Sequence, residues 1–241
     1  MTTVLSDGAV RALSGACALD LTMFRRSHVE GRVHRALALE QVDAIDELRA
    51  RLASDDRSRD AFRRSVAISV TRLFRDPEQF EVLARALRTH PLPPRPVRAW
   101  SAGCATGEEA WSIAATLAKI GRADGARILG SDLMPENVRI ARTLAPAADQ
   151  LGGAPLPDSL RMRFEVRDLV NQGVPGGGWD LVLCRNVAIY LAADQRRELH
   201  LALAGSIRLG GFLMLGRSER LHEPTALGVE RVAPHLYRRV R

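Results

Sequence analysis

A turn of small residues that ends in two adjacent carboxylates is the first feature of this sequence that could bind a ligand. The turn contains Gly103, Gly107, Glu108 and Glu109, and it lies between an apolar segment and a stretch with helical periodicity. Small residues bring bare backbone close to a ligand, but the turn has neither the G-x-G-x-x-G spacing of a dinucleotide site nor the G-K-[ST] of a P-loop. Two carboxylates would repel a phosphate and would suit hydroxyls or a cation. The chemistry therefore points to a nucleoside that carries positive charge, of which S-adenosylmethionine is the commonest.

Further residues that could contact a ligand, all polar except Leu169, occur at the ends of three later apolar segments. They are Asp132 after 127–130, Asp168 and Leu169 after 162–166, and Arg185 and Asn186 after 179–184. In a parallel sheet the carboxyl ends of the strands meet at one edge, where a carboxylate can accept hydrogen bonds from ribose hydroxyls. Any one of these acids could instead be a helix cap or a turn residue, but several at successive strand ends favour a ligand site. We expect Asp132 to hold a ribose, and Asp168 or its backbone to read an adenine amino group beside Leu169.

These residues need a sheet that places the strand ends side by side, and residues 97–241 carry the pattern of one. Apolar segments that we expect to be strands alternate with helical stretches. The strands are predicted at 97–100, 127–130, 162–166, 179–184, 212–215 and 235–240, and the helices at 108–121, 135–143 and 193–208. This alternation predicts an α/β fold with a parallel, doubly wound sheet that is covered by helices on both faces.

The first 90 residues carry only helical patterns. Helices are predicted at 8–24 with a break near Gly15, and at 25–38, 42–53, 58–68 and 77–88, the last with Pro77 in its first turn and Asp76 as its N-cap. Arg25, Arg32 and Arg35 share one side of the second helix, which a solvated face would also explain. The proline-rich HPLPPRP segment at 90–96 is interpreted as a hinge. We therefore predict a helical N-terminal domain (1–90), a linker (91–96) and an S-adenosylmethionine-binding domain (97–241).

Composition and charge argue against several other classes of protein. With 46% hydrophobic and 26% charged residues among 241, the chain has a globular composition. No apolar run reaches the roughly 20 residues of a membrane span, and no secretory signal is recognisable, so membrane insertion is not expected. The net charge of +7 forms no dense basic run and Lys119 is the only lysine, so an acidic protein partner is at least as compatible as nucleic acid. Cys17, Cys104 and Cys184 form no C-x-x-C pair, so we predict neither disulfides nor a metal site and expect a cytoplasmic location.

Several motifs together resemble one family, the CheR-type chemoreceptor protein-glutamate O-methyltransferases. The motifs are WSAGCATGEEAWSIA at 100–114, SD at 131–132, DL at 168–169, CRNVAIYL at 184–191 and GRSER at 216–220. Residues 69–76 also look like the family's T-N-x-T-x-F-F-R segment. The resemblance spans nearly the whole chain. It implies a class I S-adenosylmethionine-dependent methyltransferase fold, with a Rossmann-like doubly wound sheet preceded by a small all-helical domain.

The resemblance also implies roles for individual residues. Those that would contact the cofactor are Ser69, Thr71, Arg75, Gly103, Glu108, Asp132, Asp168, Leu169, Arg185 and Asn186. Glu108 is favoured for the methionine amino group, although Glu109 stays open. Arg75 and Tyr190 are the candidate catalytic residues, and Tyr190 matches a family tyrosine beside the transferred methyl.

The implied acceptor is a glutamate side chain of a chemoreceptor, and its chemistry needs few catalytic groups. A glutamate with a pKa of about 4.3 is already ionised at neutral pH, so no general base is required and catalysis reduces to alignment. Arg75 could orient the acceptor carboxylate. Tyr190 could donate to it or line the methyl path, although on its own it could equally be a packed aromatic. Arg32 and Arg35 match arginines of the helix that faces the glutamate-rich receptor helix, which they would steer into place.

The sequence departs from the family pattern in two regions. The family's Asn falls on Ser69 and one of its two Phe residues on Leu73, so the contacts of this segment with the cofactor are altered. Residues 145–161 are too few for the family's small antiparallel subdomain, which argues against docking of a receptor tether peptide there. Two alternatives stay open: a methyltransferase for another protein carboxylate, and a non-catalytic relative that binds S-adenosylmethionine or S-adenosylhomocysteine as a regulator. A nucleic-acid methyltransferase is not supported, because the sequence has no D/N-P-P-Y/F motif.

Overall fold

The computed structural model describes residues 4–68, 70–153 and 155–241. The chain divides into two compact units, which we describe separately. One comprises Met1–Ile68 with Tyr190–Arg196, and the other comprises Ser69–Ile189 with Arg197–Arg241. We refer to them as the helical unit and the sheet unit.

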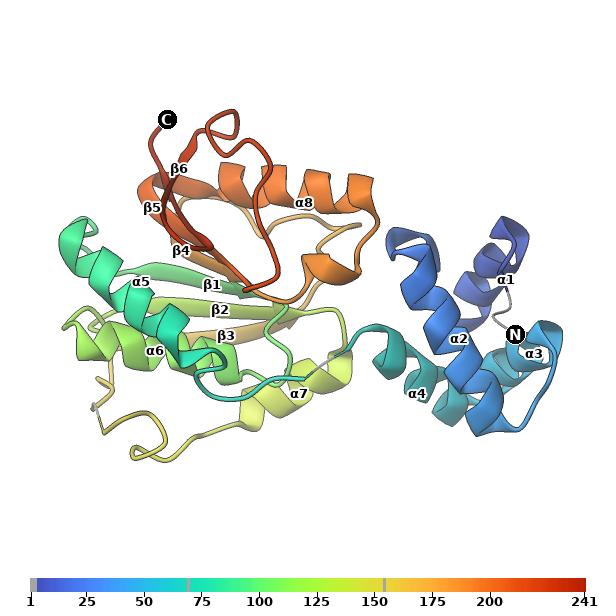
Figure 1. Cartoon of the computed structure of the whole chain (residues 1–241). Coiled ribbons are helices and arrows are strands. Elements are labelled where there is room, and N and C mark those ends of the chain that lie inside the picture. The colour runs from blue at the N-terminus through green and yellow to red at the C-terminus, as the bar shows by residue number, and fades with distance from the viewer. Residues whose placement is uncertain (1–3, 69, 154) are drawn as a thin grey trace. The chain divides into compact units, whose positions relative to one another are not determined.

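The helical unit is built from short amphipathic helices (Figure 1). They are α1 (Asp7–Cys17), the 3-10 turn η1 (Leu21–Met23), α2 (Arg26–Glu40), α3 (Ile45–Ser54) and α4 (Asp56–Val66). Their apolar faces bury Leu13, Leu48 and Leu52 completely, and this packing is what stabilises helices of such length. The predicted helices are present, but the break in the 8–24 stretch falls at Ala18 and not near Gly15, which lies inside α1. Ala18 takes a left-handed conformation (φ 49°), which ends α1.

The sheet unit contains seven strands in the order β3-β2-β1-β4-β5-β7-β6 (Figure 1). They are β1 (Arg98–Ala102), β2 (Arg127–Asp132), β3 (Arg161–Val166), β4 (Trp179–Cys184), β5 (Ile207–Leu215), β6 (Val229–Ala233) and β7 (Leu236–Arg239). Neighbours from β3 to β5 pair in parallel, whereas β7 pairs antiparallel with β5 and β6. The predicted doubly wound sheet is confirmed, and its order from β3 to β5 is Rossmann-like.

Helices cover both faces of this sheet. They are α5 (Pro77–Thr89), α6 (Glu108–Lys119), α7 (Pro135–Thr143) and α8 (Ala193–Ser206), with the short turn η2 (Ala188–Tyr190). In Figure 1, α5, α6 and α7 lie on one face, and α8 lies on the opposite face. Trp100 and Phe212 are among the largest fully buried side chains of the sheet. The carboxyl ends of β1 and β4 are adjacent, so the residues that follow these two strands are brought together.

The sequence patterns locate these elements well where burial is continuous. Helix α7 and strand β4 have the predicted bounds. Strand β5 is longer than the predicted 212–215, because its first half contains Gly210 and Gly211 and is only partly buried. The sequence pattern misses β6, whose central side chains Glu230 and Arg231 are exposed and form no apolar run.

The expected domain boundary at the linker 91–96 is wrong. Helix α5 and Leu92, expected with the helical domain and the linker, pack into the core of the sheet unit. The proline-rich segment is also tied down, because the Arg122 guanidinium donates to the carbonyls of Leu92, Pro93 and Arg95. Arg95 in turn pairs with the buried carboxylate of Asp180 at 3.1 Å. The division lies instead between residues 68 and 69, ahead of α5.

The connection between α7 and β3 is short and irregular. In its described part, 144–153 and 155–160, the chain forms no helix or strand. Leu151 is buried, and Leu156 and Leu160 pack against the core of the sheet unit. The segment therefore covers the core directly.

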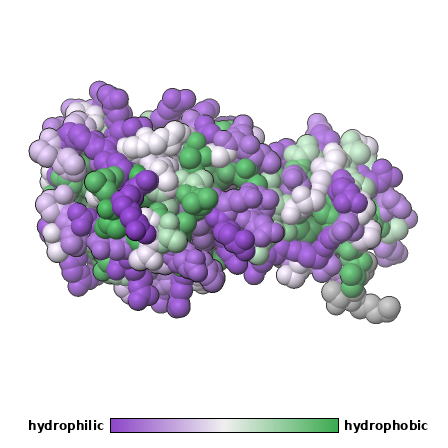
Figure 2. Space-filling model, turned by 90° about the horizontal axis from the view of Figure 1, so that it is seen from above, coloured by the Kyte–Doolittle hydropathy of each residue, from purple (hydrophilic) through white to green (hydrophobic). Residues whose placement is uncertain are grey.

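The surface is mostly hydrophilic on the face that Figure 2 presents, with apolar side chains gathered in small patches. The large exposed apolar side chains include Leu39, Val70, Leu201 and Leu209, which come from different elements. Scattered exposure of this kind is ordinary for folded proteins. Among the described residues, no helix combines the length and apolar character that crossing a bilayer requires.

Candidate cofactor site

The turn after β1 has the tight backbone that its small residues predict. The amides of Gly103 and Cys104 both donate to the Ser131 carbonyl at the end of β2, at 2.8 and 2.9 Å. Gly103 has a φ of 79°, and a Cβ atom placed on it would lie 2.4 Å from Cγ2 of Val187. The turn is therefore wedged between the ends of β2 and β4. Position 103 has room for glycine alone.

The two glutamates after this turn point to different surroundings. The Thr106 hydroxyl lies 2.8 Å from a carboxylate oxygen of Glu108, in the first turn of α6. The carboxylate of Glu109 turns inward, where it accepts from the Ser101 hydroxyl at 2.6 Å and lies 3.4 Å from the Arg185 guanidinium. Burial raises the pKa of Glu109, and Arg185 and Ser101 act in the opposite direction. Since Glu109 is committed to protein partners, Glu108 is the better candidate for a ligand contact.

Asp132 joins the end of β2 to the turn after β1. Its carboxylate accepts from the amides of Ala105 and Met134, both at 2.9 Å, and from the Asn137 side-chain amide at 2.8 Å. Burial raises the pKa of this carboxyl group. A carboxylate offers about four acceptor positions, so these bonds leave capacity for a ribose hydroxyl. The ribose contact stays a prediction.

Asp168 is occupied by its own turn. It accepts from the amides of Val170 and Asn171 at 2.9 and 3.0 Å, and from the Asn171 side chain at 2.8 Å. This is the turn-residue role that the sequence left open as the simpler reading. Leu169 is half-buried. Recognition of adenine at this strand end therefore stays a prediction that depends on the backbone and on Leu169.

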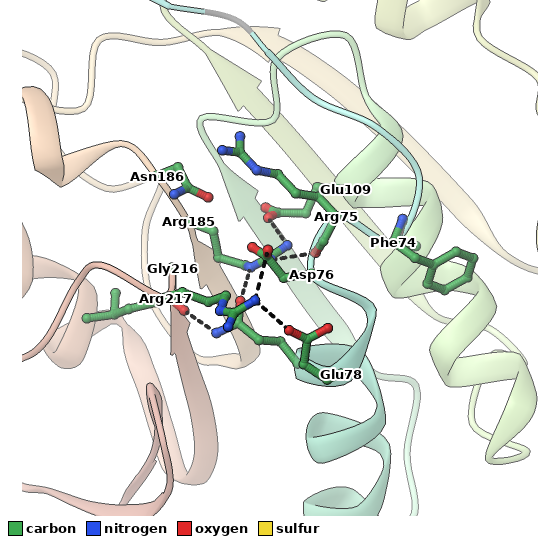
Figure 3. A network of polar contacts seen from close by, with 12 residues as sticks. Phe74, Arg75, Asp76, Glu78, Glu109, Arg185, Asn186, Gly216 and Arg217 are labelled. Atoms are coloured by element: carbon green, nitrogen blue, oxygen red, sulfur yellow. Dashed lines mark hydrogen bonds and ion pairs between the residues drawn. The ribbon is translucent and has the colours of Figure 1, made fainter.

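Arg185, the first residue after β4, lies at the centre of a buried polar network (Figure 3). Its guanidinium donates to Oε1 of Gln79 at 3.0 Å, to the Arg75 carbonyl at 2.5 Å and to the Asp76 carboxylate at 3.0 Å. A fourth contact is the ion pair with Glu109. These four protein partners occupy most of the donors of the guanidinium, and the contact of Arg185 with the cofactor stays a prediction.

Asn186 follows in a left-handed conformation with a φ of 60°. Its amide donates to the Glu219 carboxylate at 2.7 Å, which holds the backbone in place. Its side-chain Oδ1 is buried and has no hydrogen-bond partner among the described residues. An unsatisfied buried acceptor is costly, so this oxygen marks a position where a ligand donor would be stabilising.

The segment before α5 supplies the remaining expected contacts. Ser69 lies outside the described residues. Thr71 is half-buried, and the Arg75 guanidinium donates to the Val70 carbonyl at 2.7 Å, so the segment folds back on itself. The contacts of Ser69, Thr71 and Arg75 with the cofactor stay predictions.

Asp76 is the N-cap residue of α5, as predicted, but its side chain does not cap the helix. It has a left-handed φ of 54°, and its side chain makes no capping hydrogen bond. Its carboxylate binds Arg185 instead, because the buried guanidinium offers a stronger, charge-assisted partner. Phe74 is also left-handed (φ 49°), and its amide donates to the Ser112 hydroxyl of α6 at 2.8 Å.

One family model matches most of the sheet unit. The model describes the SAM-binding domain of the CheR methyltransferases, and it matches residues 69–164 and 159–233. The chain belongs to the CheR methyltransferase family. Its cofactor is S-adenosylmethionine, as the chemistry of the first turn predicts, and its reaction is methyl transfer.

Curated relatives agree with the family. The chemotaxis protein methyltransferase of Listeria innocua is 28% identical over 88% of this chain and 88% of that protein. The chemotaxis protein methyltransferase Cher2 of Pseudomonas putida is 27% identical over 87% of this chain and 88% of its own length. An uncharacterised 104.1 kDa protein of Rhodobacter capsulatus is 29% identical over 88% of this chain, which spans only 25% of that protein. Among solved structures, the magnesium protoporphyrin IX methyltransferase of Synechocystis with bound SAM is 20% identical, with a TM-score of 0.43 over 67% of this chain and 76% of that one.

The geometry of this CheR family member fits the cofactor on two independent observations. The turn after β1 lies at the carboxyl ends of the strands, where doubly wound sheets bind ligands, and Gly103 in it is half-buried. The Asn186 oxygen is an unpartnered acceptor at the neighbouring strand end. We therefore expect the turn, Glu108 and Asn186 to hold S-adenosylmethionine.

Three expected residues belong to the helical unit. Tyr190 is grouped there; its carbonyl accepts from the Arg25 amide at 2.8 Å, and its ring centroid lies 4.9 Å from that of His28. Arg32 is half-buried and Arg35 exposed on α2. Burial lowers the pKa of His28, and the charges of Arg32 and Arg25 lower it further. The catalytic and receptor-binding roles stay predictions.

Sequence reasoning assigns no role to Glu219, although it lies in the GRSER motif. The side chain is buried, and it accepts from the amides of Asn186, Gly216 and Ile189 at 2.7, 2.8 and 3.2 Å. It therefore fixes the backbone on which Asn186 is presented. The only signal was an acid shortly after an apolar strand, and two of its three partners, Asn186 and Ile189, lie about thirty residues away and could not be inferred.

Proposed function

We propose that this protein transfers the methyl group of S-adenosylmethionine to glutamate side chains in the cytoplasmic helices of chemoreceptors. The products are glutamyl methyl esters and S-adenosylhomocysteine, and the setting is adaptation in chemotaxis. Support comes from the Listeria and Pseudomonas relatives, which are named chemotaxis protein methyltransferases and align over most of their length. A receptor of this kind also places the enzyme in the cytoplasm.

The observation that carries the proposal is the composition of the four strand-end turns, 102–107, 132–134, 167–169 and 185–187. They contain backbone amides and carbonyls, side-chain carboxylates and the Asn186 side-chain amide, but no histidine that could serve as a general base. A carboxylate acceptor is the substrate class that needs none, because it is ionised at neutral pH. The cofactor supplies a methyl group that is activated by its positively charged sulfur. What is left for the protein is to hold and align the reactants.

Each residue then has a proposed task. Glu108 binds the methionine amino group, Asp132 the ribose, and Leu169 covers the adenine region, while Thr71 contacts the cofactor from the segment before α5. Arg75 orients the acceptor carboxylate. Its guanidinium already donates to the Val70 carbonyl, which leaves further N–H groups available. Tyr190 lines the methyl path.

The proposed receptor contact is the basic side of α2. Arg35 is exposed and Arg32 is half-buried there, and neither has an ion-pair partner among the described residues. Positive side chains of this kind attract glutamate-rich helices and speed their encounter. No tether-peptide contact is proposed, because the 144–160 connection is short.

The experiment is methyl transfer from labelled S-adenosylmethionine to a chemoreceptor cytoplasmic fragment. A glutamyl ester releases its label as methanol on treatment with base, which an N-methyl or S-methyl product does not. The double variant Arg32→Glu with Arg35→Glu is expected to lower kcat/KM for the receptor roughly tenfold or more. Its matched control is Arg49→Glu with Arg57→Glu, which makes the same charge change at exposed positions of α3 and α4. Binding of S-adenosylhomocysteine should be the same in both.

Two other outcomes would redirect the proposal. Base-labile transfer to a different protein but not to receptors would favour a methyltransferase for another carboxylate. Calorimetric binding of S-adenosylhomocysteine without transfer to any acceptor would favour a regulatory relative. Full transfer with unchanged cofactor affinity in Arg75→Ala would remove the orienting role of Arg75.

A further inference from the structure

The Arg185 network joins three parts of the sheet unit that lie far apart in the sequence. Its guanidinium contacts Gln79 of α5, Glu109 of α6, and the turn at Arg75 and Asp76 that precedes α5. The partners at 75, 76 and 79 are more than 100 residues away along the chain. The carbon of the guanidinium also lies 5.1 Å from the ring centroid of Phe80, a cation–π contact. One side chain therefore connects the end of β4 to two helices and to a loop.

The turn that Arg185 contacts is conformationally costly. Phe74 and Asp76 are both left-handed without being glycine, so this backbone persists only if surrounding contacts hold it. Two contacts do so from opposite sides. The Ser112 hydroxyl accepts from the Phe74 amide, and the Arg185 guanidinium binds the carbonyl of Arg75 and the carboxylate of Asp76.

The charges in this region are nearly balanced. Arg185 is paired with Asp76 and Glu109, and Arg217 lies 2.7 Å from Glu78 and 3.8 Å from Asp76 (Figure 3). The Arg185 side chain is only 2% exposed, so its charge depends on these partners. A guanidinium suits this position because its five N–H donors are spread over a rigid planar fork that reaches acceptors on separate elements, whereas an ammonium group has three donors on a single nitrogen.

From this geometry we infer that Arg185 is a positioning residue: it fastens the Arg75–Asp76 turn to the carboxyl edge of the sheet, and Glu109 is its buried counter-charge. It acts on the cofactor site through the backbone of residues 74–76 and makes no contact with the cofactor itself. Figure 3 shows the Arg75 side chain leading away from the Arg185 guanidinium, so the hydrogen bond to the Arg75 carbonyl sets where that side chain starts. Only the further step, that Arg75 orients the acceptor, rests on the proposed function.

The test compares two arginines at opposite edges of the sheet: Arg185, which is buried, and Arg95, which is exposed but pairs with the buried carboxylate of Asp180. Arg185→Lys keeps the charge but loses the fork, and Arg95→Lys does the same at the Asp180 pair. Both variants are expected to lower the melting temperature. Only Arg185→Lys should weaken the binding of S-adenosylhomocysteine, by roughly tenfold or more, and accelerate tryptic cleavage after Arg72 and Arg75.

A double-mutant cycle separates positioning from direct contact. If Arg185 acts through the turn, Asp76→Asn should weaken S-adenosylhomocysteine binding as Arg185→Lys does, and the double variant should be little worse than either single variant. Unchanged affinity in a folded Asp76→Asn, or effects that multiply in the double variant, would overturn the inference. If Arg185→Lys does not fold, the affinity of Asp76→Asn decides alone. Because these measurements need no acceptor, they are independent of whether glutamate is the substrate.

Discussion

A buried charged side chain lies at each end of strand β4, and each one holds a different segment of the chain. Asp180 near its beginning and Arg185 just after its end are both buried charges that hold an incoming segment. Asp180 binds the Arg98 amide at 2.8 Å and pairs with Arg95 and Arg208, which fixes the segment before β1. Arg185 fixes the segment before α5.

The two charges differ in the type of residue that takes the left-handed backbone conformation near them. Left-handed residues that precede β2 and β4, at the amino edge, include Gly121, Gly125 and Gly178, for which this conformation costs little. At the carboxyl edge the left-handed residues include Phe74, Asp76, Ala105 and Asn186, for which it is costly. The Asn186 oxygen there also has no hydrogen-bond partner among the described residues. Strained non-glycine residues and the unpartnered Asn186 oxygen therefore lie at the edge where we propose that the cofactor binds.

The largest expected effect comes from a change at the amino end of β4, and it concerns the free energy of unfolding and not ligand affinity. Asp180→Asn removes the counter-charge of Arg95 and Arg208, and we expect a loss of about 3 kcal/mol in the free energy of unfolding. Affinity for S-adenosylhomocysteine should stay within roughly twofold, because the site lies at the other edge. Urea unfolding and calorimetry measure the two quantities. A large loss of affinity in the folded variant would show that the edges are not separable.

The second prediction compares two glycines of similar backbone. Gly103→Ala introduces left-handed strain and a Cβ atom that overlaps Val187, so we expect roughly 100-fold weaker S-adenosylhomocysteine binding, or about 3 kcal/mol. Gly121 has a φ of 70° and nothing within 4 Å of an added Cβ atom. Gly121→Ala should therefore cost about 1 kcal/mol of stability and leave affinity unchanged. Equal losses of affinity in both variants would mean that strain, rather than the overlap in the turn, is responsible.

The third prediction tests the unpartnered oxygen. Asn186→Gly keeps the left-handed backbone but removes Oδ1, so we expect roughly tenfold weaker binding of S-adenosylhomocysteine. The free energy of unfolding without ligand should change little, because removal of an unsatisfied buried group offsets the greater freedom of glycine. Calorimetry and urea unfolding again measure both. If affinity is unchanged, the Asn186 side chain has no part in the cofactor site.

The sequence predicts the sheet and the turn well because both depend on local composition. Continuous apolar burial defines β4, and Pro135 marks the start of α7. The domain boundary fails for the opposite reason. A proline-rich segment has the composition of a linker, but the contacts from Arg122 that hold it come from about thirty residues further along.

The candidate site shows the same limit. The positions of Asp132, Arg185 and Asn186 at strand ends follow from the alternation of strands and helices. Whether an acid or an arginine there faces a ligand or another protein group depends on partners that are distant in sequence. The Arg185 and Asp76 side chains are 109 positions apart, and no local pattern pairs them. Burial of a charge between distant elements has no signature in a single sequence.

The smallest expected effect extends the comparison to the helical unit, where a half-buried histidine has arginines as its charged neighbours. Burial together with Arg32 and Arg25 lowers the pKa of His28, although its hydrogen bond to the Val66 carbonyl acts against this. A lowered pKa means that the neutral form is favoured in the folded state. The stability it contributes is therefore present above about pH 6.5 and is lost as the pH falls through the folded-state pKa.

An NMR titration of the His28 ring measures this directly, with His28→Gln to assign its signal. The midpoint should lie below about 6.5 in the native protein and rise by a few tenths of a unit, on the order of 0.3, in Arg32→Gln, since one positive neighbour is removed. Arg57→Gln, an exposed arginine of α4, makes the same charge change and should leave the midpoint where it was. An unshifted midpoint in Arg32→Gln would mean that burial alone determines the pKa of His28. The positive charge of Arg32 on α2 would then have no effect on the His28 ring, which packs against Tyr190, and would be available to attract an acidic partner.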